Sequence, residues 1–194
     1  MNIETSMKQI YHLYITHKCG HKCPLCCNKL YDIDKLPVIT VEDLNQAHTV
    51  CLTGGDPFYL LREELISIVD RLRIHYKNIQ RIYIYTSGKM LWIEGAYSHW
   101  HELMQSVSGI NVAPKDFGDW DRLDYLLQQP KWLEMTAQPG MSNRLYIFDD
   151  QWSTWETISK GVTLPQTWQV IGRKWDKEFN TPENEHFVRL PILY

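Results

Sequence analysis

The sequence predicts an α/β fold in which short strands and helices alternate along the chain. Three observations lead to this prediction: β-branched and aromatic runs recur, apolar residues at helical spacing follow several of them, and glycine or polar residues mark where the runs end. Six strands joined by crossover helices predict an open α/β sheet or a partial (β/α)6 TIM-like barrel with mostly parallel strands. We expect a single domain spanning residues 1–194.

The expected elements follow one another in a regular order. The expected strands are 9–16, 49–53, 80–86, 109–113, 144–148 and 167–171. The expected helices are 40–47, 60–75, 94–107, 118–129 and 152–161. Thr40 is the expected N-cap of the first helix, with Asp43 at its third position, and Gly161 is expected to close the last helix. The tail 179–194 has no strong periodicity, and we expect it to wrap the open side of the barrel.

Composition and charge narrow the class of protein. Hydrophobic residues make up 44% of the chain and aromatic residues 12%, which is typical of a globular protein. The net charge of −3 gives no general attraction to nucleic acid or to anionic lipid. No apolar run approaches the roughly 20 residues that span a bilayer, and the N-terminus lacks the apolar core of a signal peptide. We therefore expect a cytoplasmic protein that makes no use of a membrane.

Four of the five cysteines lie within HKCGHKCPLCCNK, residues 17–29. In a reducing compartment, clustered cysteines are more often metal ligands or catalytic groups than disulfides. Cys19, Cys23 and Cys26 have the spacing C-x3-C-x2-C, and three thiolates leave one position of a four-iron cluster without a protein ligand. An open coordination position is typical of a catalytic metal centre.

This stretch alone leaves other interpretations open. Zinc completed by His17, His21 or a distant residue is one alternative, and thiols that bind no metal are another. Cys27 adjoins a proposed ligand and Cys51 is isolated, so neither has an assigned role.

A second motif, Gly54-Gly55-Asp56-Pro57, stands between an expected strand and an expected helix. Glycines at such a turn let a ligand approach the backbone closely. A carboxylate beside them is able to accept hydrogen bonds from an ammonium group. Taken alone, the motif is also compatible with a plain turn before a helix.

The chemically distinctive residues fall at the ends of successive expected strands. The cysteine loop follows the first strand, and Gly54–Asp56 follows the second. Thr86-Ser87-Gly88 follows the third strand, and Pro114-Lys115 follows the fourth. Because parallel α/β sheets bind ligands at the carboxyl ends of their strands, we expect these four segments to meet at one site.

The Cys-x3-Cys-x2-Cys spacing followed by Gly-Gly-Asp-Pro resembles the radical S-adenosylmethionine (radical SAM) family. The resemblance covers most of the chain, although its specific motifs lie within residues 17–57. Two positions depart from the family pattern: Leu25 replaces a usual aromatic residue before the third cysteine, and Asp56 stands where glutamate is commoner. Neither departure removes a ligand.

The resemblance implies two cofactors and a reaction. Cys19, Cys23 and Cys26 would hold a [4Fe–4S] cluster, and S-adenosylmethionine would bind its fourth iron. Gly54, Gly55 and Asp56 would then hold the methionine amino group. Reductive cleavage of the cofactor would give a 5′-deoxyadenosyl radical, which abstracts a hydrogen atom from the substrate. The electron would come from an external flavodoxin-like or ferredoxin-like donor.

Two further segments are expected to contact the cofactor. Thr86 and Ser87, in a segment similar to the Thr-Asn-Gly of several family members, would reach its nucleoside or its methionine end. Asn111 and Lys115 would meet its ribose and carboxylate, with the lysine acting as a mobile point charge. An ordinary polar turn and a solvated lysine are the respective alternatives.

The substrate stays open between a small molecule and a protein. CCNK with LTGGDP resembles activases that install a glycyl radical on a partner enzyme. TSG with VAPK resembles 7-carboxy-7-deazaguanine synthases, although Cys27 and Asn28 stand where those enzymes often carry a hydroxyl residue. An alternative of another class is a non-catalytic module that binds zinc or a cluster. We expect core packing for the C-terminal tryptophans Trp152, Trp155, Trp168 and Trp175, with the wall of a substrate pocket as the alternative. We expect surface positions for most of the basic residues Arg144, Arg173, Lys174 and Arg189, with the binding of an anionic substrate as the alternative.

Overall fold

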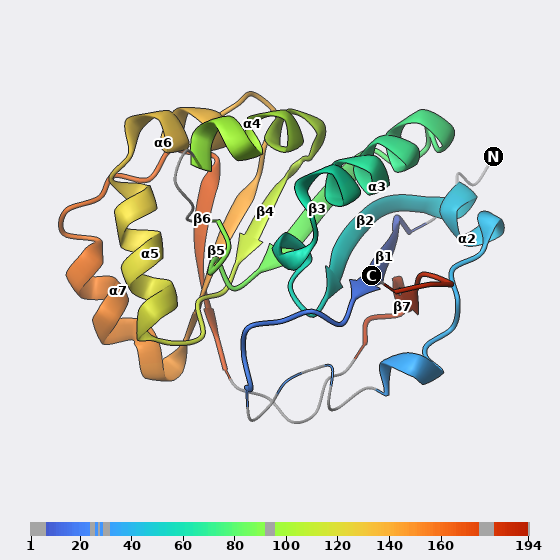
Figure 1. Ribbon diagram of the computed structural model, residues 1–194, viewed down its shortest axis with the longest axis horizontal. Helices are drawn as coiled ribbons and strands as arrows, with labels where there is room; N and C mark the ends of the chain where they lie inside the picture. The colour runs from blue at the N-terminus through green and yellow to red at the C-terminus, as the bar shows by residue number, and fades with distance from the viewer. Residues whose placement is uncertain are drawn as a thin grey trace, which may run out of the picture.

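The strands of the computed structural model form one open parallel sheet. The structure describes residues 7–23, 26, 28, 32–91, 96–174 and 181–193. The sheet order is β6-β5-β4-β3-β2-β1-β7, and each of these neighbouring pairs is parallel (Figure 1). The strands are β1 (Gln9–Thr16), β2 (Ala47–Gly54), β3 (Arg81–Thr86), β4 (Gly109–Val112), β5 (Asn143–Phe148), β6 (Trp168–Arg173) and β7 (Glu185–Arg189). The expected α/β class with parallel strands is confirmed.

Helices connect the strands as crossovers. They are α2 (Val41–Gln46), α3 (Arg62–His75), α4 (Ala96–Ser106), α5 (Phe117–Leu127), α6 (Pro130–Thr136) and α7 (Trp152–Ile158), with short 3-10 turns η1 (Ile33–Lys35), η2 (Pro57–Tyr59) and η3 (Asp149–Gln151). Thr40 caps α2 as predicted, since its side chain accepts from the Asp43 N–H and the Asp43 carboxylate accepts from the Thr40 N–H. Helix α7 ends at Ile158, three residues before the predicted end at Gly161. The Gly161 N–H donates to the carbonyl of Ile158, the last residue of the helix.

Two elements were not expected from the sequence. Helix α6 begins with Pro130 at its first turn, where the missing N–H of proline costs no hydrogen bond. Strand β7 lies within the tail and pairs with β1, so that Ile10 faces Glu185 and Tyr14 faces Arg189. The described part of the tail therefore extends the sheet beyond β1. The five residues of β7 are too few to show a clear alternation of apolar and polar residues, and the pairing with β1 determines their extended conformation.

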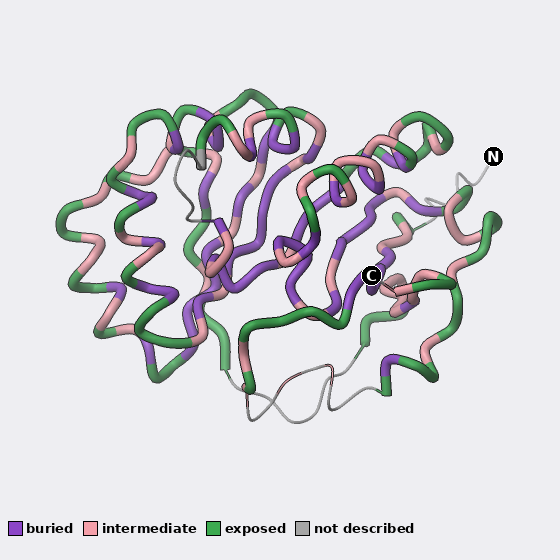
Figure 2. Tube along the Cα trace, viewed as in Figure 1, coloured by how far each residue is buried: buried purple, intermediate pink, exposed green. Residues whose placement is uncertain are grey.

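The two faces of the sheet differ in chemistry. One face carries aliphatic side chains that pack with the buried apolar residues of helices α3 to α7 in a single core; they include Leu13, Leu52, Ile84, Val112, Leu145 and Ile147. Because side chains alternate along a strand, the residues between them point to the opposite face. Those residues are polar or aromatic: His12, Cys51, Tyr85, Asn111, Arg144 and Tyr146. Most strand residues of the sheet are buried, whereas buried and exposed residues alternate along the helices (Figure 2).

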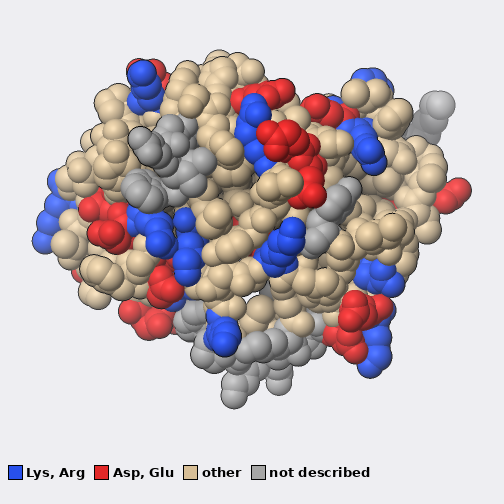
Figure 3. Space-filling view, in the orientation of Figure 1, with Lys and Arg blue, Asp and Glu red and all other residues tan. Residues whose placement is uncertain are grey.

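Surface charge and helix composition add two observations. Basic and acidic side chains are interspersed on the face drawn in Figure 3, without one large region of a single sign. Within the described ranges, every helix is too short or too polar to traverse a lipid bilayer.

Candidate metal and cofactor site

A cavity of about 270 Å³ opens at the carboxyl ends of the strands and collects most of the residues singled out from the sequence. Its lining includes all three spaced cysteines, together with Gly54, Gly55, Asp56, Thr86, Ser87 and Lys115. These residues lie at the last positions of β2 and β3 or in the loops that follow β1, β2, β3 and β4. The expected convergence of the four segments therefore occurs.

The glycine pair brings the end of β1 and the start of the cysteine loop against the end of β2. The Gly55 N–H donates to the Thr16 carbonyl at 2.7 Å, and the Asp56 N–H donates to the Lys18 carbonyl at 2.8 Å. A Cβ atom added at Gly55 would lie 2.0 Å from the Lys18 carbonyl oxygen, and Gly54 adopts a φ of +129°. The close approach that requires glycine here is thus made by the protein's own backbone.

Asp56 connects the loops after β2 and β3. Its side chain accepts hydrogen bonds from the Thr86 hydroxyl, the Ser87 hydroxyl and the Ser87 N–H, each at 2.9 Å, and from the Phe58 N–H at 3.1 Å. The residue is only 1% exposed, and burial raises the pKa of its carboxyl above the usual value although the four hydrogen bonds oppose this shift. Thr86 and Ser87 therefore contact Asp56 directly, which the sequence did not predict. We call Gly54, Gly55, Asp56, Thr86 and Ser87 the loop wall of the cavity.

The cysteines differ in their surroundings. Cys19 is exposed, Cys23 and Cys26 are partly buried, and all three line the cavity. Burial raises the pKa of the Cys19 and Cys23 thiols, and the nearby Lys115 ammonium opposes the shift at Cys23. Cys51 lies buried in β2, where burial raises its pKa to about 12, so this thiol stays neutral and apart from the other three. Cys27, Leu25 and Trp175 lie outside the described residues.

Lys115 and Asn111, both expected to contact the cofactor, lie at different depths. The Lys115 side chain lines the cavity, with its ammonium 4.3 Å from the centre of the Phe148 ring. Asn111 is 0% exposed and is not among the lining residues; its side-chain oxygen accepts from Arg144 at 3.3 Å. The Asn111 amide nitrogen has no hydrogen-bond partner among the residues described. The structure thus places Lys115 at the cavity, whereas Asn111 is buried within β4 and does not line it.

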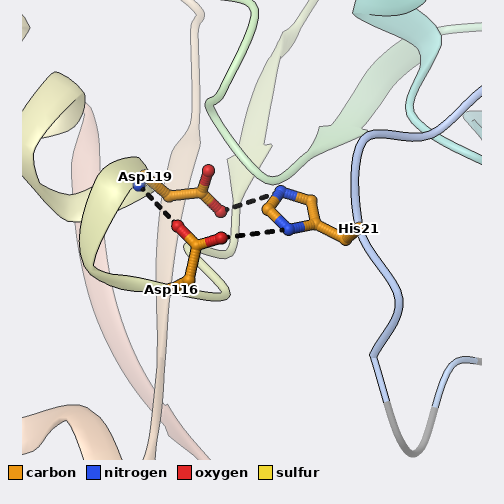
Figure 4. Close-up of side chains that lie close together, drawn as sticks. All are labelled: His21, Asp116 and Asp119. Atoms are coloured by element: carbon orange, nitrogen blue, oxygen red, sulfur yellow. Dashed lines mark hydrogen bonds and ion pairs between the residues drawn. The ribbon is translucent and has the colours of Figure 1, made fainter.

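A contact between the cysteine loop and α5 was not anticipated. His21 lies between two acids (Figure 4): its Nδ1 is 3.4 Å from Asp116 Oδ2, and its Nε2 is 3.0 Å from Asp119 Oδ2. The His21 side chain is 6% exposed and the Asp119 side chain 0%. Burial raises the pKa of the Asp119 carboxyl, while the Lys115 N–H and His21 oppose that rise. The sequence had offered His21 only as a zinc ligand, and it gave no prediction of a contact with these acids.

A further part of the cavity lining is aromatic and basic. Tyr85, Tyr146, Phe148, Arg173 and Lys174 line it, and we call these residues the aromatic wall. Tyr85 and Tyr146 stack with ring centres 6.4 Å apart, and the Arg173 guanidinium lies 4.2 Å from the centre of the Tyr146 ring. The sequence gave no prediction for the two tyrosines, although both lie at the polar positions of expected strands. Among the tryptophans, Trp155 and Trp168 are buried in the core, as expected.

The comparisons with known proteins do not identify the function of this chain. No family model matches the chain, and no curated protein matches it. Among solved structures, one described as native anSMEcpe with bound AdoMet and Cp18Cys peptide is 15% identical, with a TM-score of 0.48. The match covers 84% of this chain and 50% of that one, so this chain spans half the length of the structure it matches. Similarity of this size carries no conclusion about what this chain binds or catalyses.

Proposed function

We propose that the protein is a radical SAM enzyme with a [4Fe–4S] cluster on Cys19, Cys23 and Cys26. The observation that carries the proposal is the cavity itself. Three thiols with this spacing share one cavity with a glycine–glycine–acid turn, two hydroxyl residues and a lysine, all at the carboxyl ends of parallel strands. Enzymes of α/β architecture place their active sites at this end of the sheet.

The donor set fits the cluster better than it fits a closed zinc site. Three thiols are present at the cavity, whereas a structural zinc site needs four ligands. His21, a candidate for a fourth ligand that lines the same cavity, has its ring between the carboxylates of Asp116 and Asp119. Three thiolates and one open position suit a four-iron cluster that binds a cofactor at the fourth iron.

When bound, the cluster and S-adenosylmethionine supply an electron and a 5′-deoxyadenosyl radical that abstracts a hydrogen atom from the substrate. The residues of the chain hold and orient these groups. Asp56 offers the only carboxylate of the loop wall, and Lys115 offers a cation that lines the same cavity and acts on the Cys23 thiol. An amino group at Asp56 and a carboxylate at Lys115 would place the two ends of an amino acid across the cavity.

Asp56 has less freedom than the sequence suggested. Its Oδ2 already accepts three hydrogen bonds, and its Oδ1 accepts one. An ammonium group would therefore meet a carboxylate whose position is fixed before the cofactor arrives. Such preorganisation reduces the entropy that binding must overcome. Thr86 and Ser87 act on the cofactor through Asp56 in this proposal, in addition to any direct contact with it.

We assign the substrate to the aromatic wall, because the cysteines, the loop wall and Lys115 are assigned to the cluster and the cofactor.

Both a glycyl-radical activase and a 7-carboxy-7-deazaguanine synthase-like enzyme are compatible with this cavity, because each needs the same cluster and cofactor. An external one-electron donor of flavodoxin or ferredoxin type belongs to the proposal, since no second group of cysteines occurs in the sequence.

The test is anaerobic reconstitution of the protein with iron and sulfide. We expect a brown protein with four irons that, once reduced with dithionite, converts S-adenosylmethionine into 5′-deoxyadenosine and methionine in equal amounts. A non-catalytic zinc-binding module is the alternative, and it would give a colourless protein with one zinc. A fully loaded cluster that yields no 5′-deoxyadenosine, with or without candidate substrates, would contradict the enzyme proposal.

A further inference from the structure

We infer that His21, held between Asp116 and Asp119, is a positioning residue that fixes the cysteine loop relative to Lys115. The contact would set how the cofactor lies between the cluster and that lysine. The inference rests on the proposed function, because it assigns the cofactor to this cavity. It goes further because it names the groups that determine the distance between the cysteine loop and Lys115.

His21 is placed to act on two cluster ligands at once. It lies two residues after Cys19 and two residues before Cys23 in the sequence. It lines the same cavity as the cysteines, its side chain is only 6% exposed, and its ring meets Asp116 and Asp119 at the start of α5. A displacement of this side chain would therefore move the backbone that carries both thiols.

The acids that hold His21 are themselves fixed by α5. Asp116 is the N-cap of the helix, and its Oδ1 accepts from the Asp119 N–H at 2.9 Å. Asp119 Oδ2 accepts from the Lys115 N–H at 2.9 Å and lies 3.0 Å from His21 Nε2. One carboxylate oxygen thus contacts both the cysteine loop and the backbone of Lys115. Groups that orient metal ligands in this way influence a metal site without touching the metal.

The same three residues have the composition of a metal site, since their ligand atoms lie within 4.8 Å of one another. Their arrangement argues against a shared ion. The two carboxylates approach different nitrogens of the His21 ring, and the lone pairs of those nitrogens diverge. A metal ion binds only one of them. The arrangement is that of a ring held between two carboxylates.

The experiment compares Asp119→Asn with Asp121→Asn, an exposed acid of the same helix, in the reconstituted full-length protein. Asparagine keeps an oxygen for the Lys115 N–H but removes the charge that faces His21. We expect four irons in both variants, because all three cysteines remain. We expect S-adenosylmethionine affinity to fall about tenfold in Asp119→Asn alone, with a weaker cofactor-induced change in the EPR spectrum of the reduced cluster.

A double-mutant cycle with His21→Gln separates positioning from a general loss of stability. If the two residues act through their contact, the His21→Gln/Asp119→Asn protein binds the cofactor no more weakly than either single variant. Additive losses would overturn the inference, as would an equal loss in Asp121→Asn.

The outcomes distinguish this inference from the proposed function. A wild-type protein that takes up no four-iron cluster or binds no cofactor overturns both. A wild-type protein that does both, with unchanged affinity in Asp119→Asn, overturns the inference alone. Titration of EDTA-treated, reconstituted wild-type protein with Mn²⁺ adds a further check: a one-to-one site that Asp119→Asn abolishes would mean that these residues are metal ligands, and the inference would be wrong.

Discussion

The loop wall and the aromatic wall line the same cavity but are built in different ways. In the loop wall, the short side chains of Asp56, Thr86 and Ser87 bond to one another and to the backbone, and the glycine pair packs directly on backbone atoms. The aromatic wall consists of long side chains in ring and cation–π contacts, and its Arg173 and Lys174 are exposed. Side chains held by the backbone suit the binding of one invariant cofactor. Long side chains have more rotamers, so the aromatic wall is better able to adjust its shape to a substrate.

The largest effect is expected at the cysteines, where removal of one thiol should abolish the cluster. Cys23→Ala removes a proposed cluster ligand that no other described side chain at the cavity replaces, so we expect no four-iron centre in the optical spectrum or by iron analysis. Cys51→Ala is the matched control. Its thiol is buried in β2 with a pKa of about 12, and its loss should leave the iron content unchanged. Normal iron content in Cys23→Ala would refute the ligand assignment.

The next largest effect is expected at the glycine pair. Gly55→Ala would place a Cβ 2.0 Å from the Lys18 carbonyl oxygen, and forced overpacking of this kind costs about 1–3 kcal/mol or more. We expect lower stability in urea denaturation, together with poor cluster assembly, since the cysteine loop begins at this contact. Gly161→Ala serves as control because its nearest neighbour, the Ile158 carbonyl oxygen, is 3.8 Å from the added atom. Equal stability of the two variants would mean that the loops can separate without cost.

A pH-dependent effect is expected at Asp56. Burial raises its pKa in the folded protein above the unfolded value of 3.8, so folding favours the protonated form. The stability that this group contributes is therefore present below pH 3.8 and lost as the pH rises through the raised pKa. Compared with Asp56→Asn, the wild-type protein should lose unfolding free energy as the pH rises from 3 to 7. A constant difference between the two proteins across this range would show that Asp56 titrates normally.

The smallest effect on the fold is expected at the aromatic wall. Arg173→Met removes an exposed cation from the Tyr146 ring, a contact of about 0.5–1 kcal/mol. We expect unchanged iron content and unchanged cofactor cleavage without substrate, and a loss only in the substrate-dependent reaction once a substrate is known. Weak cofactor binding in this variant would mean that the aromatic wall also holds the cofactor, and the contrast between the walls would fail.

The sequence by itself determined the parallel α/β class, most of the strands and the end of the sheet where the site lies. These follow from local patterns: apolar periodicity identifies helices, β-rich runs identify strands, and a short motif after each strand must lie at the carboxyl end of a parallel sheet. The cysteine spacing and Gly54–Asp56 are short local motifs of this kind, so the sequence was sufficient to identify them.

Only the tertiary structure decided which partners those residues meet. Thr86 and Ser87 bond to Asp56 some 30 residues away, His21 meets two acids almost 100 residues away, and β7 pairs with β1 from the far end of the chain. Such contacts leave no local pattern, because they depend on how the loops are brought together when the sheet forms. The two tyrosines of the aromatic wall were missed for the same reason: they lie at alternating strand positions, and only the assembled sheet determines which of its faces the helices cover.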